Sequence, residues 1–368
     1  MQFIARGPDV PDHLLHLHEN GKVVFFCGAG ISAPAGLPLF SCLVEQLSDE
    51  FKRLHLSLSK EKIEKLGSDR AIHLMELKYI QDRLGVRKHV MELLTPNFDK
   101  SGVTDTHKAL LTLAKHHNKI RLVTTNFDRI FEEAIKEQGL NVKRYQAPAL
   151  PIANHLWNSL VYLHGLLPKP EDDASALEDL VLSSPDFGVA YIAHGWASRF
   201  VLDMFRNYTV CFIGYSVEDP PIRYITDALI ANSGRLSDPS HTPEMYAFIH
   251  YSEDGEKRNQ VKEEWDVRGI TPILYYREDG DEYHKYLHDT LKEWSRICLD
   301  IVGSKKAIID KYAQRLPAES TGEDDFFSRM RWALSDRHGE SAKYFAEMNP
   351  APPFEWLEII EESYSGKS

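Results

Sequence analysis

The stretch VVFFCGAGISAPAGLP, from Val23 to Pro38, joins an apolar run to a glycine-rich turn. The run is apolar without alternation, which is typical of a strand buried on both faces of a parallel sheet. Gly28 and Gly30 leave room where backbone must approach a pyrophosphate, and the amides of a following helix would face that charge. The stretch therefore predicts the first strand and the nucleotide-binding turn of a Rossmann-like fold.

The turn departs from the usual dinucleotide fingerprint. That fingerprint continues G-x-G-x-x-G and has an acidic residue about 20 positions further on. Here the third glycine, Gly36, comes six positions after Gly30. Glu45 and Asp49 fall within the next predicted helix and are not cleanly placed to bind a ribose. This is a variant nucleotide loop, and hydride transfer is not favoured.

Further apolar runs predict the other strands. They are IRLVTT before Asn126, LVYLH ending at His164, TVCFIG ending at Gly214, MYAFIH ending at His250, and ITPILYY over 270–276. Helical periodicity fills the gaps, most clearly over 43–56, 127–137 and 283–299. The alternation predicts an α/β fold, a Rossmann-like parallel sheet with helices on both faces.

Two longer segments, 57–106 and 145–208, do not follow the alternation. We expect them to be helical inserts that form a small module over the carboxyl edge of the sheet. From about Gly303 the pattern changes, and PAESTGEDD after Leu316 is linker-like. We expect one domain over 1–302, followed by a linker and a helical docking or oligomerisation segment over 303–368.

The composition excludes several classes of protein. Lys and Arg total 43 against 55 Asp and Glu, a formal net charge of −12, so direct nucleic-acid binding is not expected. No segment has the roughly 20 unbroken apolar residues of a membrane helix. The N-terminus lacks the apolar run of a signal peptide, so we expect a cytoplasmic protein without membrane contact. None of the four cysteines forms a C-x-x-C pair, and no metal site is predicted.

The sequence TTNFD follows the second long predicted strand. Ligands of such folds bind at the carboxyl edge of the sheet. Asn126 offers a donor and an acceptor, suited to holding a ribose or a water, and Thr125 lies beside it. Asp128 either joins such a site or only caps the following helix.

Two further motifs leave predicted strands. LHG supplies His164, and the histidine side chain in general suits general-base work, although a lone histidine is more often structural. In GYSVEDPPI, Gly214 and Ser216 can admit and bond a phosphate or ribose, while Asp219-Pro220-Pro221 is typical of a helix start.

Together, the elements G-A-G-x-S with G-x-P, T-x-N-x-D, H-G and G-x-S occur in the order found in sirtuins. The chain resembles the divergent, bacterial defence-associated sirtuin-like NAD hydrolases more closely than the protein deacylases. GYSVEDPPI and SSPDFGVAYI (183–192) are similar to features of that branch. The resemblance covers residues 22–301, and four ordered motifs are more specific than any one of them.

The resemblance implies roles for residues of these motifs. Asn126 and Asp128 would order the nicotinamide ribose, and His164 would be the catalytic base. The resemblance implies that Ala29, Gly30 and Ser32 hold the NAD phosphates, and that Pro38 and Phe40 shape the nicotinamide side. Gly214 and Ser216 would contact the adenosine half, and Gly28 and Thr125 would be further contacts.

The chain also departs from the deacylases. They continue the first motif as G-I-P-D-F-R, whereas residues 36–41 here read GLPLFS and lack the Asp and the Arg. The two zinc-binding C-x-x-C pairs of the deacylases have no substitute. The acyl-lysine cleft is therefore in doubt, and water becomes the favoured acceptor.

The resemblance thus implies an NAD hydrolase that releases nicotinamide and ADP-ribose from NAD, acting as an abortive-infection antiphage effector. Two alternatives stay open: a module that senses NAD or ADP-ribose without turnover, and a zinc-free deacylase or ADP-ribosyl transferase. Because an unregulated enzyme of this kind would kill its own cell, we expect a homo-oligomer. A separate nucleotide-driven ATPase or helicase-type partner, or a fused sensor, would complete the control.

Overall fold

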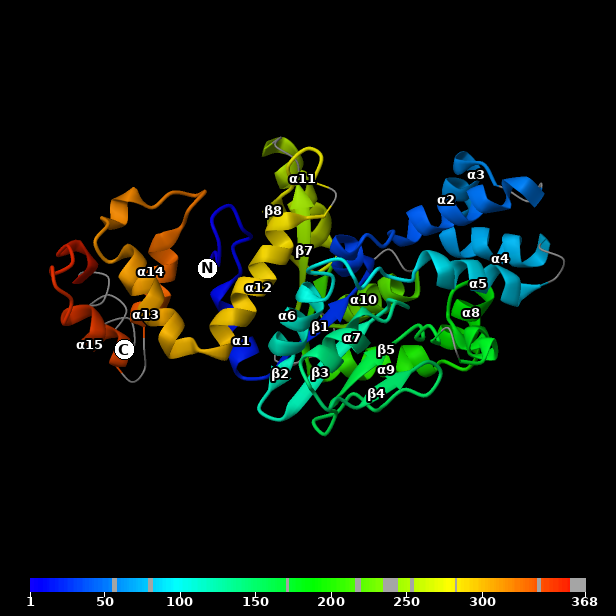
Figure 1. Ribbon diagram of the computed structural model, residues 1–368, viewed down its shortest axis with the longest axis horizontal. Coiled ribbons are helices and arrows are strands. Elements are labelled where there is room, and N and C mark those ends of the chain that lie inside the picture. The colour runs from blue at the N-terminus through cyan, green and yellow to red at the C-terminus, as the bar shows by residue number, and fades with distance from the viewer. Residues whose placement is uncertain are drawn as a thin grey trace. The chain divides into compact units, whose positions relative to one another are not determined.

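The computed structural model describes residues 1–54, 58–78, 82–169, 172–215, 220–233, 244–251, 255–281, 283–335 and 339–357 (Figure 1). The chain divides into two units. One comprises Asn20–Ala247 with Lys262–Pro272, and the other comprises Met1–Glu19, Phe248–Val261 and Ile273–Ser368. The domain boundary that we predict at residue 302 separates a catalytic domain from a docking segment. The division into these two units does not test it, and it stays a prediction. Within the described part of the chain, no helix is both long and apolar enough to cross a membrane.

One eight-stranded sheet has the order β4-β5-β3-β1-β6-β7-β8, with β2 paired antiparallel to β3. Its strands are β1 (Val23–Cys27), β2 (Lys115–His116), β3 (Lys119–Thr124), β4 (Arg144–Gln146), β5 (Ser159–Tyr162), β6 (Thr209–Ile213), β7 (Met245–Tyr251) and β8 (Thr271–Tyr276). The pairs from β4 through to β7 are parallel. Every residue of β1, β5 and β6 is buried, as expected for strands covered on both faces. The predicted Rossmann-like parallel sheet is confirmed.

The register aligns the carboxyl ends of the central strands. Cys27, the last residue of β1, pairs with Thr124 of β3 on one side and with Ile213 of β6 on the other. Thr124 in turn pairs with Tyr162, the last residue of β5. The chain moves from β1 through β3 to β5, then returns to the other side of β1 with β6. This reversal is the kind of switch point at which α/β sheets bind ligands.

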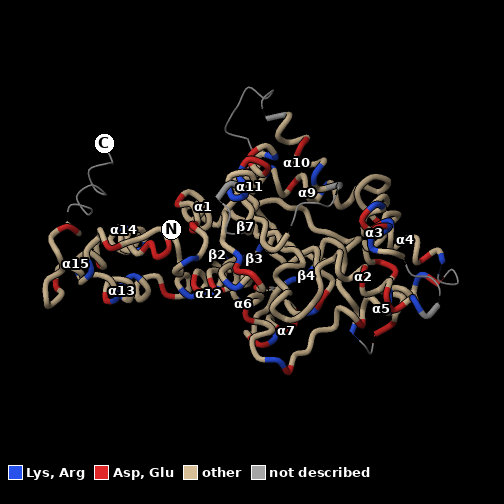
Figure 2. The backbone as a smooth tube through the Cα atoms, turned by 90° about the horizontal axis from the view of Figure 1, so that it is seen from above, with Lys and Arg blue, Asp and Glu red and all other residues tan. Residues whose placement is uncertain are grey.

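Helices fill the connections of the unit that begins at Asn20. They are η1 (Ala29–Ala35), α2 (Phe40–Glu50), η2 (Phe51–Leu54), α3 (Lys60–Leu66), α4 (Ser68–Lys78), α5 (Arg83–Leu93), α6 (Asp105–Leu113), α7 (Ile130–Glu137), η3 (Ala174–Asp179), α8 (Ser184–Phe187), η4 (Gly188–Ala193), α9 (Trp196–Asn207) and α10 (Pro220–Ser233). Helices α9 and α10 lie on one side of the strands and α6 and α7 on the other, with acidic and basic residues interleaved along them (Figure 2). Helix α11 (Gly255–Val267) has residues in both units.

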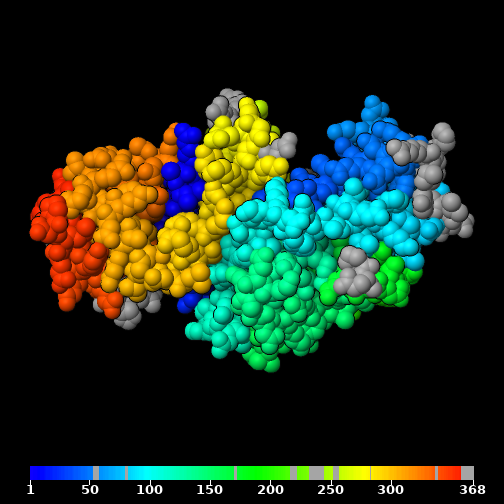
Figure 3. Space-filling view, in the orientation of Figure 1, coloured from blue at the N-terminus to red at the C-terminus, as the bar shows by residue number. Residues whose placement is uncertain are grey.

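The two predicted inserts pack together. Apolar side chains of α2 to α5 form one buried cluster with residues of the segment after β5, namely Leu167, Leu177, Leu180 and Leu182. Helices α4 and α5 lie against η3 and α8 in the ribbon and in the space-filling view (Figures 1 and 3). The described part of the first insert is mainly helical up to Leu93 and continues without a helix to Thr104. The second insert also contains β5 and most of β4.

A buried ion network joins these inserts. The Arg87 side chain of α5 is fully buried, and its Nε donates to Glu76 of α4 at 2.8 Å. Its Nη1 donates to the carbonyls of Leu177 and Leu180 at 2.7 and 2.9 Å, and its Nη2 pairs with Asp186 of α8. The Asp186 carboxylate also accepts from the backbone and hydroxyl of Ser183 in a capping box. Arg87 therefore fixes the start of α8.

The other unit has its own apolar cluster. Its helices are α1 (Asp12–Glu19), α12 (Lys285–Leu299), α13 (Ile301–Tyr312), η6 (Pro317–Glu319), α14 (Phe326–Leu334) and α15 (Glu340–Ala346). Tyr312 and Phe326 stack at 5.2 Å, and the fully buried Trp356 donates its indole N–H to the Arg315 carbonyl at 2.8 Å. The segment after residue 302 thus buries aromatic side chains against one another.

Replacement of Arg87 tests the network. Arg87→Met keeps a long apolar stem but removes the fully buried cation, and Glu76 and Asp186 keep only the partly exposed Arg83 as a cationic partner. We therefore expect the free energy of unfolding to fall by about 3 kcal/mol. Urea denaturation followed by circular dichroism measures the loss. The control is Arg206→Met, because Arg206 is two-thirds exposed and lies 3.9 Å from Asp203. Equal effects of the two variants would contradict the assigned role of Arg87.

Candidate active site

The predicted site residues follow four neighbouring strands at their carboxyl ends. Gly28 follows β1, Thr125, Asn126 and Asp128 follow β3, His164 follows β5, and Gly214 follows β6. Since these strands are aligned, the structure gathers the residues along one edge of the sheet. Ser216 lies outside the described residues.

Ser32 links the first two motifs. Its hydroxyl donates to Asp128 Oδ2 at 2.8 Å and accepts from the Asn126 amide at 3.1 Å. His107 of α6 lies on the same hydroxyl, with Nε2 at 3.4 Å from Oγ. All of these side chains are buried. Ser32 and Asn126, predicted as contacts for NAD, are thus held in one polar network, and His107 is a member that sequence reasoning missed.

Asp128 contacts both the polar network and the start of α7. Its Oδ1 accepts from the backbone N–H of Ile130 at 3.0 Å, at the start of α7, while its Oδ2 faces Ser32. Burial raises the pKa of the Asp128 carboxyl, and the hydrogen bonds from Ile130 and Ser32 oppose that rise. The N-cap of α7 is Arg129, so Asp128 is not the N-cap residue. Asp128 instead accepts the first N–H of α7 from the position before the N-cap and also orients the polar network.

His164 is buried beside aromatic rings. Its Nε2 lies 2.9 Å from the hydroxyl of Tyr191, and the Phe187 ring packs edge-on at 5.1 Å. The backbone carbonyl of His164 accepts from Val181 at 2.8 Å. Tyr191 belongs to the SSPDFGVAYI motif, but sequence reasoning did not assign it to the site.

The glycines allow two loops to meet. The Gly30 amide donates to the Gly214 carbonyl at 2.9 Å, and a Cβ on Gly30 would lie 2.7 Å from Gly214 Cα. Gly214 has φ +59°, and a Cβ there would lie 2.6 Å from the Ile31 nitrogen. The missing side chains thus make room for backbone of the same chain. Their predicted contact with phosphates stays a prediction.

Two helices follow the glycine turn, and the first of them is a short 3₁₀ helix. Residues Ala29–Ala35 form a 3₁₀ helix that ends at Gly36 with φ 82°, and the α-helix begins only at Phe40. Ala29, Pro38 and Thr125 are partly exposed. The Phe40 ring packs against the apolar cluster of the inserts. The predicted nicotinamide side therefore adjoins the helical insert.

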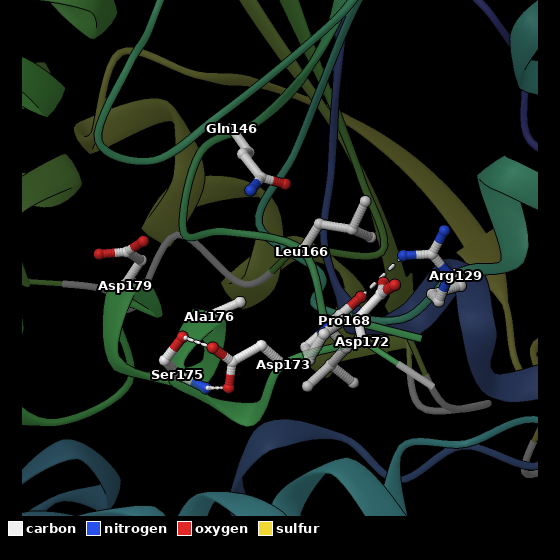
Figure 4. A pocket seen from close by; sticks show the side chains of 10 residues that line it. Arg129, Gln146, Leu166, Pro168, Asp172, Asp173, Ser175, Ala176 and Asp179 are labelled. Atoms are coloured by element: carbon white, nitrogen blue, oxygen red, sulfur yellow. Dashed lines mark hydrogen bonds between the residues drawn. The ribbon is translucent and has the colours of Figure 1, made fainter. Parts of the chain in front are cut away.

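A cavity of about 430 Å³ opens next to these residues (Figure 4). It is lined by the last residue of β4, Gln146, and by residues that follow β3 and β5, among them Arg129, Leu166, Asp172, Asp173 and Asp179. Arg129 donates to the Leu167 carbonyl at 2.8 Å. Since the predicted NAD contacts do not line it, this cavity is adjacent to the candidate site. Among the described residues, no group of three or more His, Cys, Asp or Glu side chains could hold a metal ion.

The raised pKa of Asp128 makes stability depend on pH. The folded state binds this proton more tightly than the unfolded chain, so ionisation of Asp128 destabilises the fold as pH rises from about 3.8 through the raised pKa. Asp128→Asn cannot ionise, so its free energy of unfolding should improve relative to wild type across that window. Urea denaturation at a series of pH values measures this, with Asp99→Asn at an exposed carboxyl as control. A difference independent of pH would contradict the prediction.

The approach of the loops is tested at Gly30. Gly30→Ala places a Cβ against backbone that cannot move aside, so we expect a loss of about 1–3 kcal/mol in the free energy of unfolding. Gly188→Ala is the control, since Gly188 has φ −57° and nothing within 4 Å of the added carbon. Thermal unfolding compares the two variants. A neutral Gly30→Ala would show that the loops do not pack as described.

Comparisons with known proteins bear on the family. A family model described as SIR2-like domain matches residues 120–273. "Uncharacterized protein y4cA" of Sinorhizobium fredii is 26% identical, over 100% of this chain and 30% of that protein. "NAD(+) hydrolase ThsA" of Cytobacillus dafuensis is 26% identical over 85% of this chain and 55% of that protein. The protein of the same name from Acinetobacter baumannii is 29% identical, over 58% and 40%.

The chain spans about a third to about half the length of these curated relatives. Among solved structures, a mutant Sir2 homologue in complex with ADP-ribose is 15% identical with a TM-score of 0.39, covering 79% of this chain and 99% of that one. The matched domain contains the T-x-N-x-D, H-G and G-x-S motifs. Residues 120–273 are therefore similar to the SIR2-like domain, and the matched stretch holds three of the four motifs.

Proposed function

We propose that this chain hydrolyses NAD at the bond between nicotinamide and ribose, giving nicotinamide and ADP-ribose. The observation that carries the proposal is the gathering of Asn126, Asp128 and His164 at the carboxyl ends of β3 and β5, beside the glycine turn of β1. The SIR2-like match and the relatives named NAD(+) hydrolase support it.

The proposed reaction needs little acid catalysis, because nicotinamide leaves NAD as a neutral molecule from a cationic nitrogen. The glycosidic C–N bond breaks with its electron pair going to nicotinamide, and a water oxygen forms the new bond to ribose C1′. Asn126 positions the ribose and the water, and Asp128 orients the network around them. His164 accepts the proton that the water loses.

Several finer features belong to the same proposal. Water rather than acyl-lysine is the acceptor, in keeping with the missing Asp and Arg in residues 36–41. The activity serves antiphage defence by depleting NAD in the cytoplasm. Because uncontrolled depletion would kill the cell, the activity is switched on only in an assembly: a homo-oligomer, with a separate ATPase- or helicase-type partner or a fused sensor. Residues 303–368 serve as its docking segment.

Nicotinamide release by the purified chain tests the proposal. We expect release by wild type, and a fall of at least about 100-fold for Asn126→Ala and for His164→Ala, because each removes a group that positions or deprotonates the reactants. Chromatography of nicotinamide and ADP-ribose measures the turnover. Asn97→Ala and His155→Ala, at exposed positions of the same unit, are the matched controls.

Other products would favour the alternatives. Saturable NAD binding without nicotinamide release, at high protein concentration and under all activating conditions, would indicate a sensor. Acyl or ADP-ribosyl transfer to a protein would indicate a transferase. Wild-type turnover in both alanine variants would refute the site assignment.

A further inference from the structure

We infer that Tyr191 is a positioning residue for His164: its hydroxyl fixes the imidazole through Nε2. The inference rests on the proposed function, in which His164 is the base. It concerns a residue outside the four motifs, in the short π-helix η4. Such wide turns are rare and occur often at functional sites.

The contact is buried and well shaped. The Tyr191 hydroxyl lies 2.9 Å from His164 Nε2, with 5% of Tyr191 and 3% of His164 exposed. The Phe187 ring stacks on Tyr191 with planes 17° apart and meets the imidazole edge-on. The Phe187 and Tyr191 rings therefore restrict the rotation of the imidazole, and the Tyr191 hydroxyl makes a polar contact with its Nε2.

The segment that carries Tyr191 is anchored at both ends. Before it, the capping box of α8 and the pairing of Asp186 with Arg87 fix Phe187. After it, the Ser198 hydroxyl of α9 donates to the Tyr191 carbonyl at 2.6 Å. Because both ends are held, the hydroxyl cannot follow the imidazole if the ring rotates. The first helical insert is thereby connected to His164 through Arg87, Asp186 and Tyr191.

The chemistry of imidazole makes this contact matter. A neutral histidine has one N–H and one lone pair, and the partner of one nitrogen decides which of them the other presents. The Tyr191 hydroxyl can donate to Nε2 or accept from it, so the contact fixes the rotamer of His164, and its loss changes the balance between the two tautomers. Without the hydroxyl, Nε2 loses this hydrogen bond and the ring gains alternative orientations.

Tyr191→Phe removes only this hydroxyl and keeps the ring that stacks on Phe187. We expect kcat for nicotinamide release to fall by about 10- to 100-fold. KM for NAD should change little, and the pH profile of kcat should shift. The matched control is Tyr208→Phe, which removes a hydroxyl bonded to the Asn154 carbonyl at 2.6 Å and should retain kcat. Wild-type kcat and pH profile in Tyr191→Phe would overturn the inference.

A readout independent of turnover separates this inference from the proposed function. In ¹⁵N-histidine spectra, the His164 signals are assigned by their loss in His164→Asn. We expect one dominant tautomer in wild type, and nitrogen shifts that move toward each other in Tyr191→Phe but not in Tyr208→Phe. Unchanged shifts in Tyr191→Phe would refute the positioning role even if the chain hydrolyses NAD. Changed shifts without nicotinamide release would refute the proposed function and leave the contact established.

Discussion

The close approach of the loops after β1 and β6 is the constraint on which the candidate site depends. β1 is paired with β3 on one side and with β6 on the other, so the loop that follows β1 lies between the loops that follow these two strands. The hydrogen bond from Gly30 to Gly214 closes that approach, and a Cβ on either glycine would meet backbone at 2.6–2.7 Å. With this contact in place, Ser32 comes within reach of Asn126 and Asp128, which leave β3. The polar network therefore follows from a steric requirement.

The sequence predicts the long strands because burial on both faces produces continuous apolar runs. It does not predict β4, whose three residues are partly or fully exposed and carry no apolar run. The 3₁₀ helix after the turn also escapes prediction, since its residues have no helical periodicity and its end depends on the positive φ of Gly36. The sequence predicts helices over 303–368, but it does not predict that the aromatic side chains around Trp356 pack into one buried cluster.

The same distinction applies to the site. Asn126, Asp128 and His164 lie directly after predicted strands, so pattern and motif order identify them together. His107 and Tyr191 reach Ser32 and His164 across separations of 75 and 27 residues, from α6 and from a π-helix. No local pattern encodes such contacts, because they arise from the packing of helices on the sheet. The SSPDFGVAYI motif was the one available signal for Tyr191, and it specifies a segment rather than a side-chain direction.

The completeness of the polar network bears on how a ligand can bind. The Ser32 hydroxyl already donates to Asp128 and accepts from Asn126, and both partners are buried. A phosphate oxygen that accepts from the Ser32 hydroxyl must therefore replace the hydrogen bond to Asp128 rather than add to it. Such an exchange contributes little net affinity, because the folded protein loses one bond for each that it gains. Affinity would then come mainly from the rest of the nucleotide, while the buried network fixes the orientation of the ribose, which is the division of labour that favours reaction over tight ground-state binding.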